Sequence, residues 1–95
     1  MRRVSAKRAA RAAERRAVVA AVMERDGWRC QAAELVPSVR CGGPLDAHEV
    51  LSRGRGGSIY DAANIVSICR MHHRWVGEHP DAANALGLWH HSWGS

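Results

Sequence analysis

Residues 46–73 read DAHEVLSRGRGGSIYDAANIVSICRMHH, and this stretch decides the fold. Two short stretches that contain apolar residues, 45–52 and 64–68, flank a basic, glycine-rich connection, which is typical of a β-hairpin with a long loop. A helix is predicted over 69–78, ending before His79 because a residue that precedes proline avoids the helical conformation. The order of strand, loop, strand and helix predicts a small α+β fold.

The flanking segments complete the predicted organisation. Residues 5–25 are rich in alanine and free of Pro and Gly, and Asp26 with Gly27 forms a stop signal, so a long N-terminal helix is expected. Only the C-terminal half of this helix, around Val18 and Val22, has an apolar side to bury. The predicted parts are a basic helical arm at 1–26, a compact domain at 27–80, and a short helical turn with a Trp/His-rich tail at 81–95.

The composition predicts a thin hydrophobic core. The chain has 95 residues and no Phe, and much of its 46% hydrophobic fraction is alanine, so a metal staple is an expected source of stability. Trp75 is expected to pack the helix onto the hairpin, and Trp28 either covers the metal knuckle or remains partly exposed, with structural packing favoured. Three widely spaced cysteines do not fit a secreted disulfide framework and suit metal-binding thiolates in a reducing compartment. No apolar run is long enough to span a membrane, and we expect a cytoplasmic protein.

The positive charge is concentrated at the N-terminus. Residues 1–16 carry seven basic side chains and one acidic one, whereas residues 17–95 carry seven basic and eight acidic ones. Such a segment neutralises phosphates and releases counterions, so nucleic acid is the leading partner and binding should weaken with salt. Considered alone, the arm is equally well explained as a solvated helix face or a disordered tail.

Four features of the central stretch resemble the HNH endonuclease motif. They are a polar pair at the end of the first strand (His48 and Glu49), Gly56-Gly57 in the loop, Asn64 before the second strand, and Cys69-x-x-His72-His73 entering the helix. The resemblance implies a ββα-metal fold with a zinc knuckle and the metal-dependent hydrolysis of DNA phosphodiester bonds, by nicking or by cutting both strands.

The polar pair departs from the family pattern. In the family the first member usually binds the catalytic metal and the second is a histidine that activates water, whereas here His48 takes the ligand position and Glu49 the base position. Either Glu49 is the general base, or a one-residue shift makes His48 the base while Asp46 or Glu49 binds the metal. Strand alternation places Asp46 and His48 on one face and Glu49 on the other. The sequence leaves both readings open, with His48 the leading candidate, Glu49 second and Asp46 third.

The resemblance also assigns roles to Asn64 and His73. Asn64 would hydrogen-bond the backbone across the loop and hold the first strand in place. His73 would bind a single catalytic divalent ion, Mg²⁺, Mn²⁺, Ni²⁺ or Zn²⁺, together with His48. Many family members carry another histidine four residues further on, but position 77 is glycine here, and His79 would lie on a different side of a regular helix.

A second, structural metal is implied by the cysteines. Family members often carry two Cys-x-x-Cys knuckles; here the second is Cys69-x-x-His72, and Cys30 and Cys41 replace the first. Three thiolates and one imidazole form a usual structural zinc set. The alternative is three unligated cysteines with His72 on the surface.

The expected partner is double-stranded DNA. Predicted DNA-binding residues lie in the glycine-rich loop and the arm: Arg53, Arg55, Lys7, Arg8, Arg11 and Arg15. Small HNH proteins of this kind look like phage or prophage products, so the resemblance implies the cytoplasm of a bacterial host, a monomer or weak dimer, and action beside packaging proteins such as terminase.

Two non-enzymatic hypotheses compete with the nuclease. The first is a zinc-stapled nucleic-acid-binding module that has lost catalysis along with the histidine of the base position. The second is an adaptor that binds packaging proteins through the Trp-rich tail.

Overall fold

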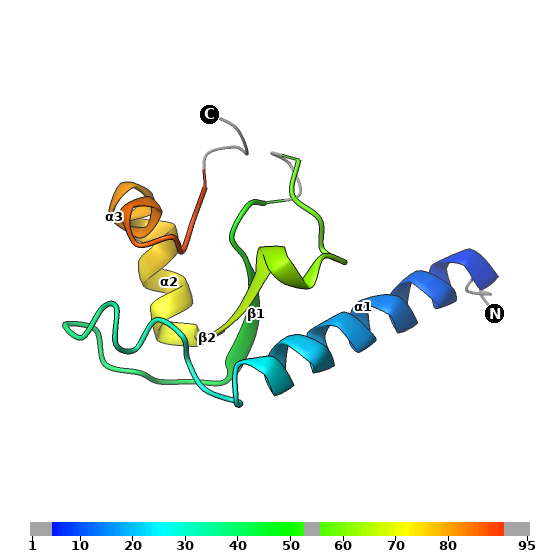
Figure 1. Ribbon diagram of the computed structural model, residues 1–95, viewed down its shortest axis with the longest axis horizontal. Helices are drawn as coiled ribbons and strands as arrows, with labels where there is room; N and C mark the ends of the chain where they lie inside the picture. Colours follow the sequence, from blue (N-terminus) through cyan, green and yellow to red (C-terminus); the bar gives the residue numbers. More distant parts are fainter. Residues whose placement is uncertain (1–4, 53–55, 91–95) are drawn as a thin grey trace.

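The computed structural model describes residues 5–52 and 56–90. Within these residues the chain forms three α-helices, one short 3-10 helix and a two-stranded antiparallel sheet (Figure 1). The elements are α1 (Ala6–Arg25), β1 (Leu45–Glu49), η2 (Ala62–Asn64), β2 (Ile65–Cys69), α2 (Arg70–Glu78) and α3 (Pro80–Ala85). The α+β class and the order of strand, loop, strand and helix are confirmed.

Helix α1 begins and ends where the sequence signals lie. The Ser5 hydroxyl accepts a hydrogen bond from the Arg8 backbone N–H at 3.1 Å, which caps the first turn. At the other end Gly27 and Trp28 both have positive φ angles, 67° and 56°, and the Trp28 N–H donates to the Met23 carbonyl at 3.0 Å. Packing was favoured for Trp28 over partial exposure, but the residue is 60% exposed and its indole N–H donates to Glu24 Oε1 at 3.3 Å.

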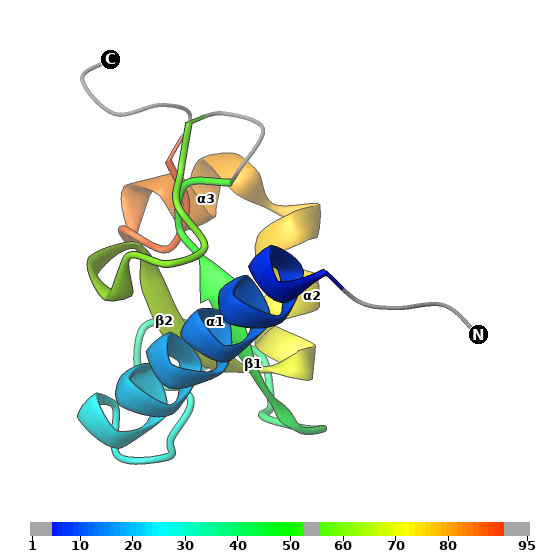
Figure 2. The same ribbon diagram turned by 90° about the vertical axis from the view of Figure 1, so that its right-hand side faces the viewer.

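The two faces of the hairpin pack against different helices. Strand β1 pairs with β2 in a register that puts His48 opposite Val66 and Glu49 opposite Ile65. Glu49 contacts Arg15 of α1, whereas Asp46 contacts His73 of α2, so successive β1 side chains alternate between the α1 face and the α2 face. Figure 1 shows the hairpin between α2 and α1, with the N-terminal half of α1 extending away from the body, and Figure 2 shows α1 in front of the hairpin.

The main buried cluster lies on the α2 side of the sheet. It combines residues of β2, α2 and α3 with residues of the 26–44 loop and the C-terminal segment: Ala32, Val36, Ile68, Val76, Ala83 and Leu88. Trp75 is half-buried against this cluster, as expected. In the described residues no helix is both long and apolar enough to cross a membrane.

Asn64 ties the two ends of the hairpin loop together. Its side chain accepts from the Leu51 N–H and donates to the Leu51 carbonyl, both at 2.8 Å, and it also donates to the Ser58 carbonyl at 3.1 Å. Asn64 is only 2% exposed, so these backbone contacts replace the water it would otherwise bind. Gly57 passes so close to Leu51 that an added Cβ would meet the Leu51 carbonyl oxygen at 1.7 Å. The loop conformation therefore requires glycine at position 57.

The outer edge of β2 is covered by the segment that follows α1. The Ser67 N–H donates to Asp26 Oδ2 at 2.8 Å, and the Gln31 N–H donates to the Ser67 carbonyl at 2.9 Å. Arg25 binds the same Asp26 carboxylate through two nitrogens and also donates to the Ile65 and Ala62 carbonyls. The Arg25 side chain lowers the pKa of Asp26, and the Ser67 N–H adds to this effect against the opposing effect of burial. Asp26 therefore anchors α1 to the sheet.

We expect Asp26→Ala to lower the free energy of unfolding by about 1–3 kcal/mol, because it leaves the Ser67 N–H without its acceptor. Urea denaturation at pH 7 with saturating zinc measures the change. The control Glu34→Ala removes an exposed carboxylate from the 26–44 loop and should stay within about 0.5 kcal/mol of the parent chain. Equal stability of the two variants would contradict the anchoring role of Asp26.

Candidate functional site

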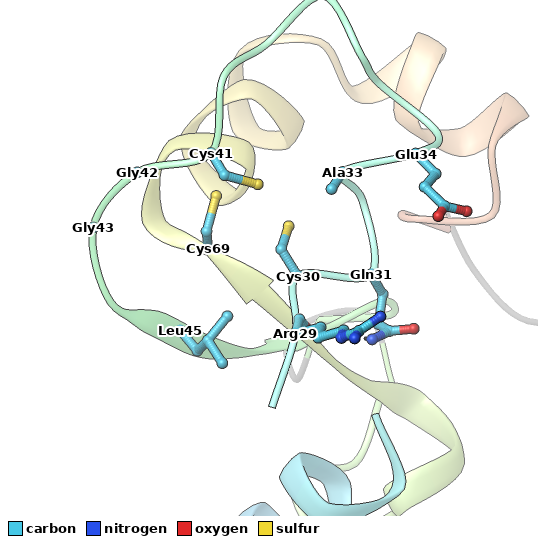
Figure 3. Close-up of a pocket in the computed structure, with 10 residues that line it drawn as sticks. All are labelled: Arg29, Cys30, Gln31, Ala33, Glu34, Cys41, Gly42, Gly43, Leu45 and Cys69. Atoms are coloured by element: carbon cyan, nitrogen blue, oxygen red, sulfur yellow. Dashed lines mark hydrogen bonds between the residues drawn. The ribbon is translucent and has the colours of Figure 1, made fainter. Parts of the chain in front are cut away.

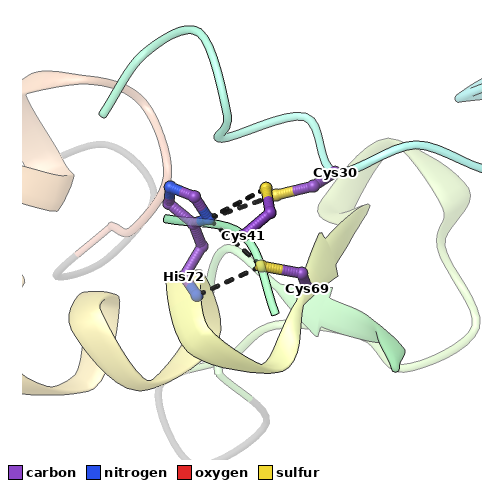
Figure 4. Close-up of side chains that lie close together, drawn as sticks. All are labelled: Cys30, Cys41, Cys69 and His72. Atoms are coloured by element: carbon purple, nitrogen blue, oxygen red, sulfur yellow. Dashed lines mark hydrogen bonds between the residues drawn. The ribbon is translucent and has the colours of Figure 1, made fainter. Parts of the chain in front are cut away.

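Four predicted metal ligands lie together at one end of the hairpin. The ligand atoms of Cys30, Cys41, Cys69 and His72 are all within 4.8 Å of one another. His72 Nδ1 lies 3.6 Å from the Cys30 sulfur, 3.5 Å from the Cys41 sulfur and 3.1 Å from the Cys69 sulfur (Figure 4). The predicted clustering of these residues is confirmed, and the cluster could hold a metal ion.

Local structure brings Cys30 and Cys41 together although they are ten residues or more apart from each other and from Cys69 in the sequence. Cys69 caps the N-terminus of α2, and its sulfur accepts the His72 N–H, so the Cys-x-x-His step occupies the first helical turn. Cys41 lies close to Cys69 because the glycines that follow it pack tightly against α2. The Met71 N–H donates to the Gly42 carbonyl at 3.2 Å. A Cβ at Gly43 would lie 2.7 Å from Arg70 Cβ, so a larger residue would push this segment away. The sulfurs of Cys30, Cys41 and Cys69 point toward one another beside an open hollow of about 680 Å³ (Figure 3).

The geometry of the cluster fits a tetrahedral ion. In a site with the usual zinc bond lengths, a sulfur and a nitrogen ligand lie about 3.6 Å apart, which is close to the distances that His72 makes here. His72 Nε2 lies 3.1 Å from the Val36 carbonyl, which can only accept, so Nε2 carries the proton and the Nδ1 lone pair faces the sulfurs. Burial raises the pKa of the Cys69 thiol, but hydrogen bonds from the backbone of His72 and Gly42 outweigh it and lower the pKa to about 6. Cys69 is therefore prepared to act as a thiolate ligand.

A second group of predicted residues lies on the α2 face of β1. The rings of His48 and His73 are 5.0 Å apart, centroid to centroid, in a T-shaped arrangement. They line a hollow of about 330 Å³ at the free edge of β1, together with Ala47, Glu49, Ser52, Val76, Gly77 and Trp89. Two imidazoles that share one ion at about 2.1 Å and roughly tetrahedral angles have centroids about 5 Å apart. The spacing of the two rings therefore matches that of two imidazoles on one ion, whereas the group of three or more close metal-binding side chains found in the described residues is the cluster of Cys30, Cys41, Cys69 and His72.

Each of the two histidines has one nitrogen engaged and one available. His48 is 6% exposed, and its Nε2 lies 2.6 Å from the Leu88 carbonyl, so Nε2 carries a proton and Nδ1 keeps its lone pair. Burial lowers the pKa of His48 and so favours its neutral form. Only a neutral imidazole can bind a metal ion or accept a proton. His73 Nδ1 lies 3.1 Å from Asp46 Oδ2, which leaves Nε2 available.

Asp46 is occupied by two partners. Arg70 donates to both of its oxygens, at 2.8 and 3.0 Å, and His73 approaches the same Oδ2. The Arg70 guanidinium is the main cause that lowers the pKa of Asp46 to about 2, and the contact with His73 contributes in the same direction. Asp46 is thus an ionised acceptor beside His73 at neutral pH.

The remaining predicted residues lie at the rim or elsewhere. Glu49 lines the histidine hollow and makes a 3.6 Å ion pair with Arg15. Arg15 also donates to the Ile59 carbonyl at 2.7 Å, which connects α1 to the hairpin loop. The side chain of Arg15, predicted to bind DNA, is therefore already used in contacts within the protein. Lys7, Arg8 and Arg11 are exposed on the part of α1 that extends from the body, whereas Arg53 and Arg55 lie outside the described residues. His79 stacks on Trp75, as expected for a residue that faces away from the hollow.

Sequence reasoning missed the contribution of the segment that follows α3. Leu88 supplies the carbonyl that accepts from His48, Trp89 lines the histidine hollow, and the His90 N–H donates to the Val50 carbonyl at 2.9 Å. Two of these contacts use backbone atoms, which carry no residue-specific signal. The one clue in the sequence was the apolar Leu88 directly after Gly87, a place where a chain leaving a helix often packs back.

We expect the purified chain to hold one zinc ion, measured by mass spectrometry of the metal content. Cys69→Ser should abolish zinc retention and cost several kcal/mol of stability, because the folding of small metal domains is coupled to binding. His79→Ala removes an exposed histidine outside the cluster and should retain one zinc. Full zinc content in Cys69→Ser would contradict the four-ligand site.

Comparisons with known proteins give no further identification. No protein-family model, no curated protein and no solved structure matches this chain.

Proposed function

We propose that the chain is a small metal-dependent DNA endonuclease of the HNH type with a structural zinc ion at Cys30, Cys41, Cys69 and His72. The observation that carries the proposal is the pairing of His48 and His73, one from β1 and one from α2, at 5.0 Å over a hollow at the hairpin edge. The sequence resemblance names the same two histidines. An isolated zinc knuckle gives no reason for this second histidine pair.

His48 Nδ1 and His73 Nε2 are the nitrogens that would hold the catalytic ion. The hydrogen bonds of His48 to Leu88 and of His73 to Asp46 leave the lone pair of each ring on these two nitrogens. When bound, a divalent ion stabilises the charge that develops on a scissile phosphate and its leaving oxygen. Two protein ligands leave room for water and phosphate oxygens.

Glu49 is the residue that we assign as general base. Glu49 is among the residues that line the hollow of the two histidines, and its carboxylate pairs with Arg15 on the α1 side at 3.6 Å. A carboxylate in this place can take a proton from an attacking water. With both histidine nitrogens assigned to the ion, Glu49 is the carboxylate that remains at the hollow, which favours this reading over His48 as base.

Asn64 supports the chemistry without touching the reacting atoms. Its three hydrogen bonds hold Leu51 and Ser58 at the two ends of the hairpin loop. The end of β1, which carries His48 and Glu49, is thereby fixed relative to the loop. Asn64 is therefore a positioning residue under this proposal.

The basic arm supplies affinity for DNA. Lys7, Arg8 and Arg11 are exposed on one extended helix, and residues 17–95 carry no comparable excess of positive charge. Contacts of this kind read the phosphate backbone and not the bases, so the proposed cleavage has low sequence specificity. A non-catalytic module would share the arm and the zinc cluster but makes no use of the histidine hollow.

We expect the zinc-loaded chain to nick supercoiled plasmid when Mg²⁺, Mn²⁺ or Ni²⁺ is added, and to be inactive when no second divalent ion is added. His73→Ala should abolish nicking, and Glu49→Gln should slow it by about 10²–10⁴-fold, the usual contribution of a general base. His79→Ala serves as the matched histidine control and should keep full activity. A nearly unchanged rate for Glu49→Gln would assign the base to His48, whereas retarded DNA with no cleavage under any ion would favour the non-catalytic module.

We also expect replacement of Lys7, Arg8 and Arg11 by Gln to weaken DNA binding and flatten its salt dependence. The slope of log affinity against log salt should fall by about 0.9 for each phosphate that the arm no longer neutralises, or roughly 3 in all. Fluorescence anisotropy with a labelled duplex at several salt concentrations measures this slope. The control Arg40→Gln removes an exposed arginine of the 26–44 loop and should leave the slope unchanged, and a slope unaffected by the arm substitutions would locate the DNA contacts elsewhere.

A further inference from the structure

We propose that Asp46 is a positioning residue that sets the tautomer and ring orientation of His73, and that Arg70 holds Asp46 in place for this purpose. The inference rests on the proposed function for its catalytic meaning, but the hydrogen-bond arrangement itself is independent of cleavage. It gives Asp46 a role different from the metal ligand expected from the sequence.

The hydrogen bonds around Asp46 have a defined direction. Arg70 donates from Nε to Asp46 Oδ2 at 2.8 Å and from a terminal nitrogen to Oδ1 at 3.0 Å, a bidentate pairing that fixes the plane of the carboxylate. The Asp46 carboxylate can then only accept from His73 Nδ1, 3.1 Å away. The His73 proton is thereby held on Nδ1, and the Nε2 lone pair is free to bind an ion.

These contacts make Asp46 a poor direct ligand. Both of its oxygens already accept hydrogen bonds, and its side chain is 19% exposed between β1 and the first turn of α2. It also does not line the hollow that His48 and His73 share. Direct coordination would require Asp46 to give up the Arg70 pairing, whereas a positioning role uses the observed contacts as they stand.

The fold places the three residues in a way that suits this role. Asp46 lies two residues before His48 on the same face of β1, and Arg70 and His73 are neighbours on one side of α2 at a spacing of three residues. The strand that supplies one histidine therefore also orients the histidine of the helix. Carboxylates that accept from the distal nitrogen of a metal-binding histidine commonly contribute about 10- to 100-fold to metal affinity.

The decisive measurement is the tautomer of His73 in zinc-loaded protein without the second ion, read from long-range ¹H–¹⁵N correlations of the imidazole. In the parent chain we expect Nδ1 to be protonated and Nε2 to be unprotonated. Asp46→Ala should shift the ring toward the Nε2-protonated tautomer, and Arg70→Gln should do so in part. The control Arg74→Gln removes a cation one turn away on α2 and should leave the spectrum unchanged.

Metal titration and kinetics give the second readout. Calorimetry with Mn²⁺ should show affinity about 10- to 100-fold weaker in Asp46→Ala, and saturating Mn²⁺ should restore most of the nicking rate. Asp46→Asn retains an oxygen acceptor for His73 Nδ1 and should lie between the parent and Asp46→Ala, which keeps the test valid if the alanine variant folds poorly.

The outcomes separate the two proposals. If the chain never cleaves DNA but shows the expected tautomer shift, the positioning role of Asp46 is supported and the nuclease proposal is contradicted. A chain that cleaves DNA while His73 has the same tautomer in the parent and in Asp46→Ala keeps the nuclease and overturns the role of Asp46. If saturating Mn²⁺ fails to restore nicking in Asp46→Ala and the tautomer of His73 is unchanged, Asp46 would instead be a direct ligand of the metal ion.

Discussion

The convergence of Cys30, Cys41, Cys69 and His72 is the constraint on which the rest of the structure depends. These residues join the segment after α1, the segment before β1 and the junction between β2 and α2. The 26–44 region has no helix or strand of its own, and the buried cluster to which it contributes is small and partly built from alanine. A metal ion there would contribute binding free energy directly to folding, as small metal-stapled domains require.

The same constraint fixes the candidate active site. His72 and His73 are adjacent in the first turn of α2, and successive helical residues point about 100° apart. With His72 turned toward the sulfurs and Val36, His73 is turned toward β1, where it meets Asp46 and His48. The cluster therefore contributes, with the Arg70–Asp46 pairing and buried Val76, to the rotation of α2 that brings the two histidines together.

The sequence was sufficient for those parts of the structure that local signals specify. The Ser5 cap, the Gly27 stop, the hairpin loop around Gly57 and the Cys-x-x-His step all have near-neighbour causes, and the resemblance supplied the roles expected of Asn64 and His73. The unpredicted contacts each join a side chain to a backbone atom that is distant in the sequence: Asp26 to the Ser67 N–H, and His48 to the Leu88 carbonyl. Packing was favoured for Trp28 because its residue type suits burial, and residue type does not reveal that Gly27 and Trp28 both adopt positive φ and that Trp28 is exposed.

The placement of α1 limits how DNA can meet the proposed site. Arg15 contacts Glu49 and Ile59 from the α1 side, whereas His48 and His73 meet on the α2 side of the same hairpin. A duplex that lies along the exposed arm residues Lys7, Arg8 and Arg11 can reach the histidine hollow only around the free edge of β1. Under this proposal the arm supplies affinity and the hollow supplies chemistry, so substitutions in the hollow should leave DNA binding intact.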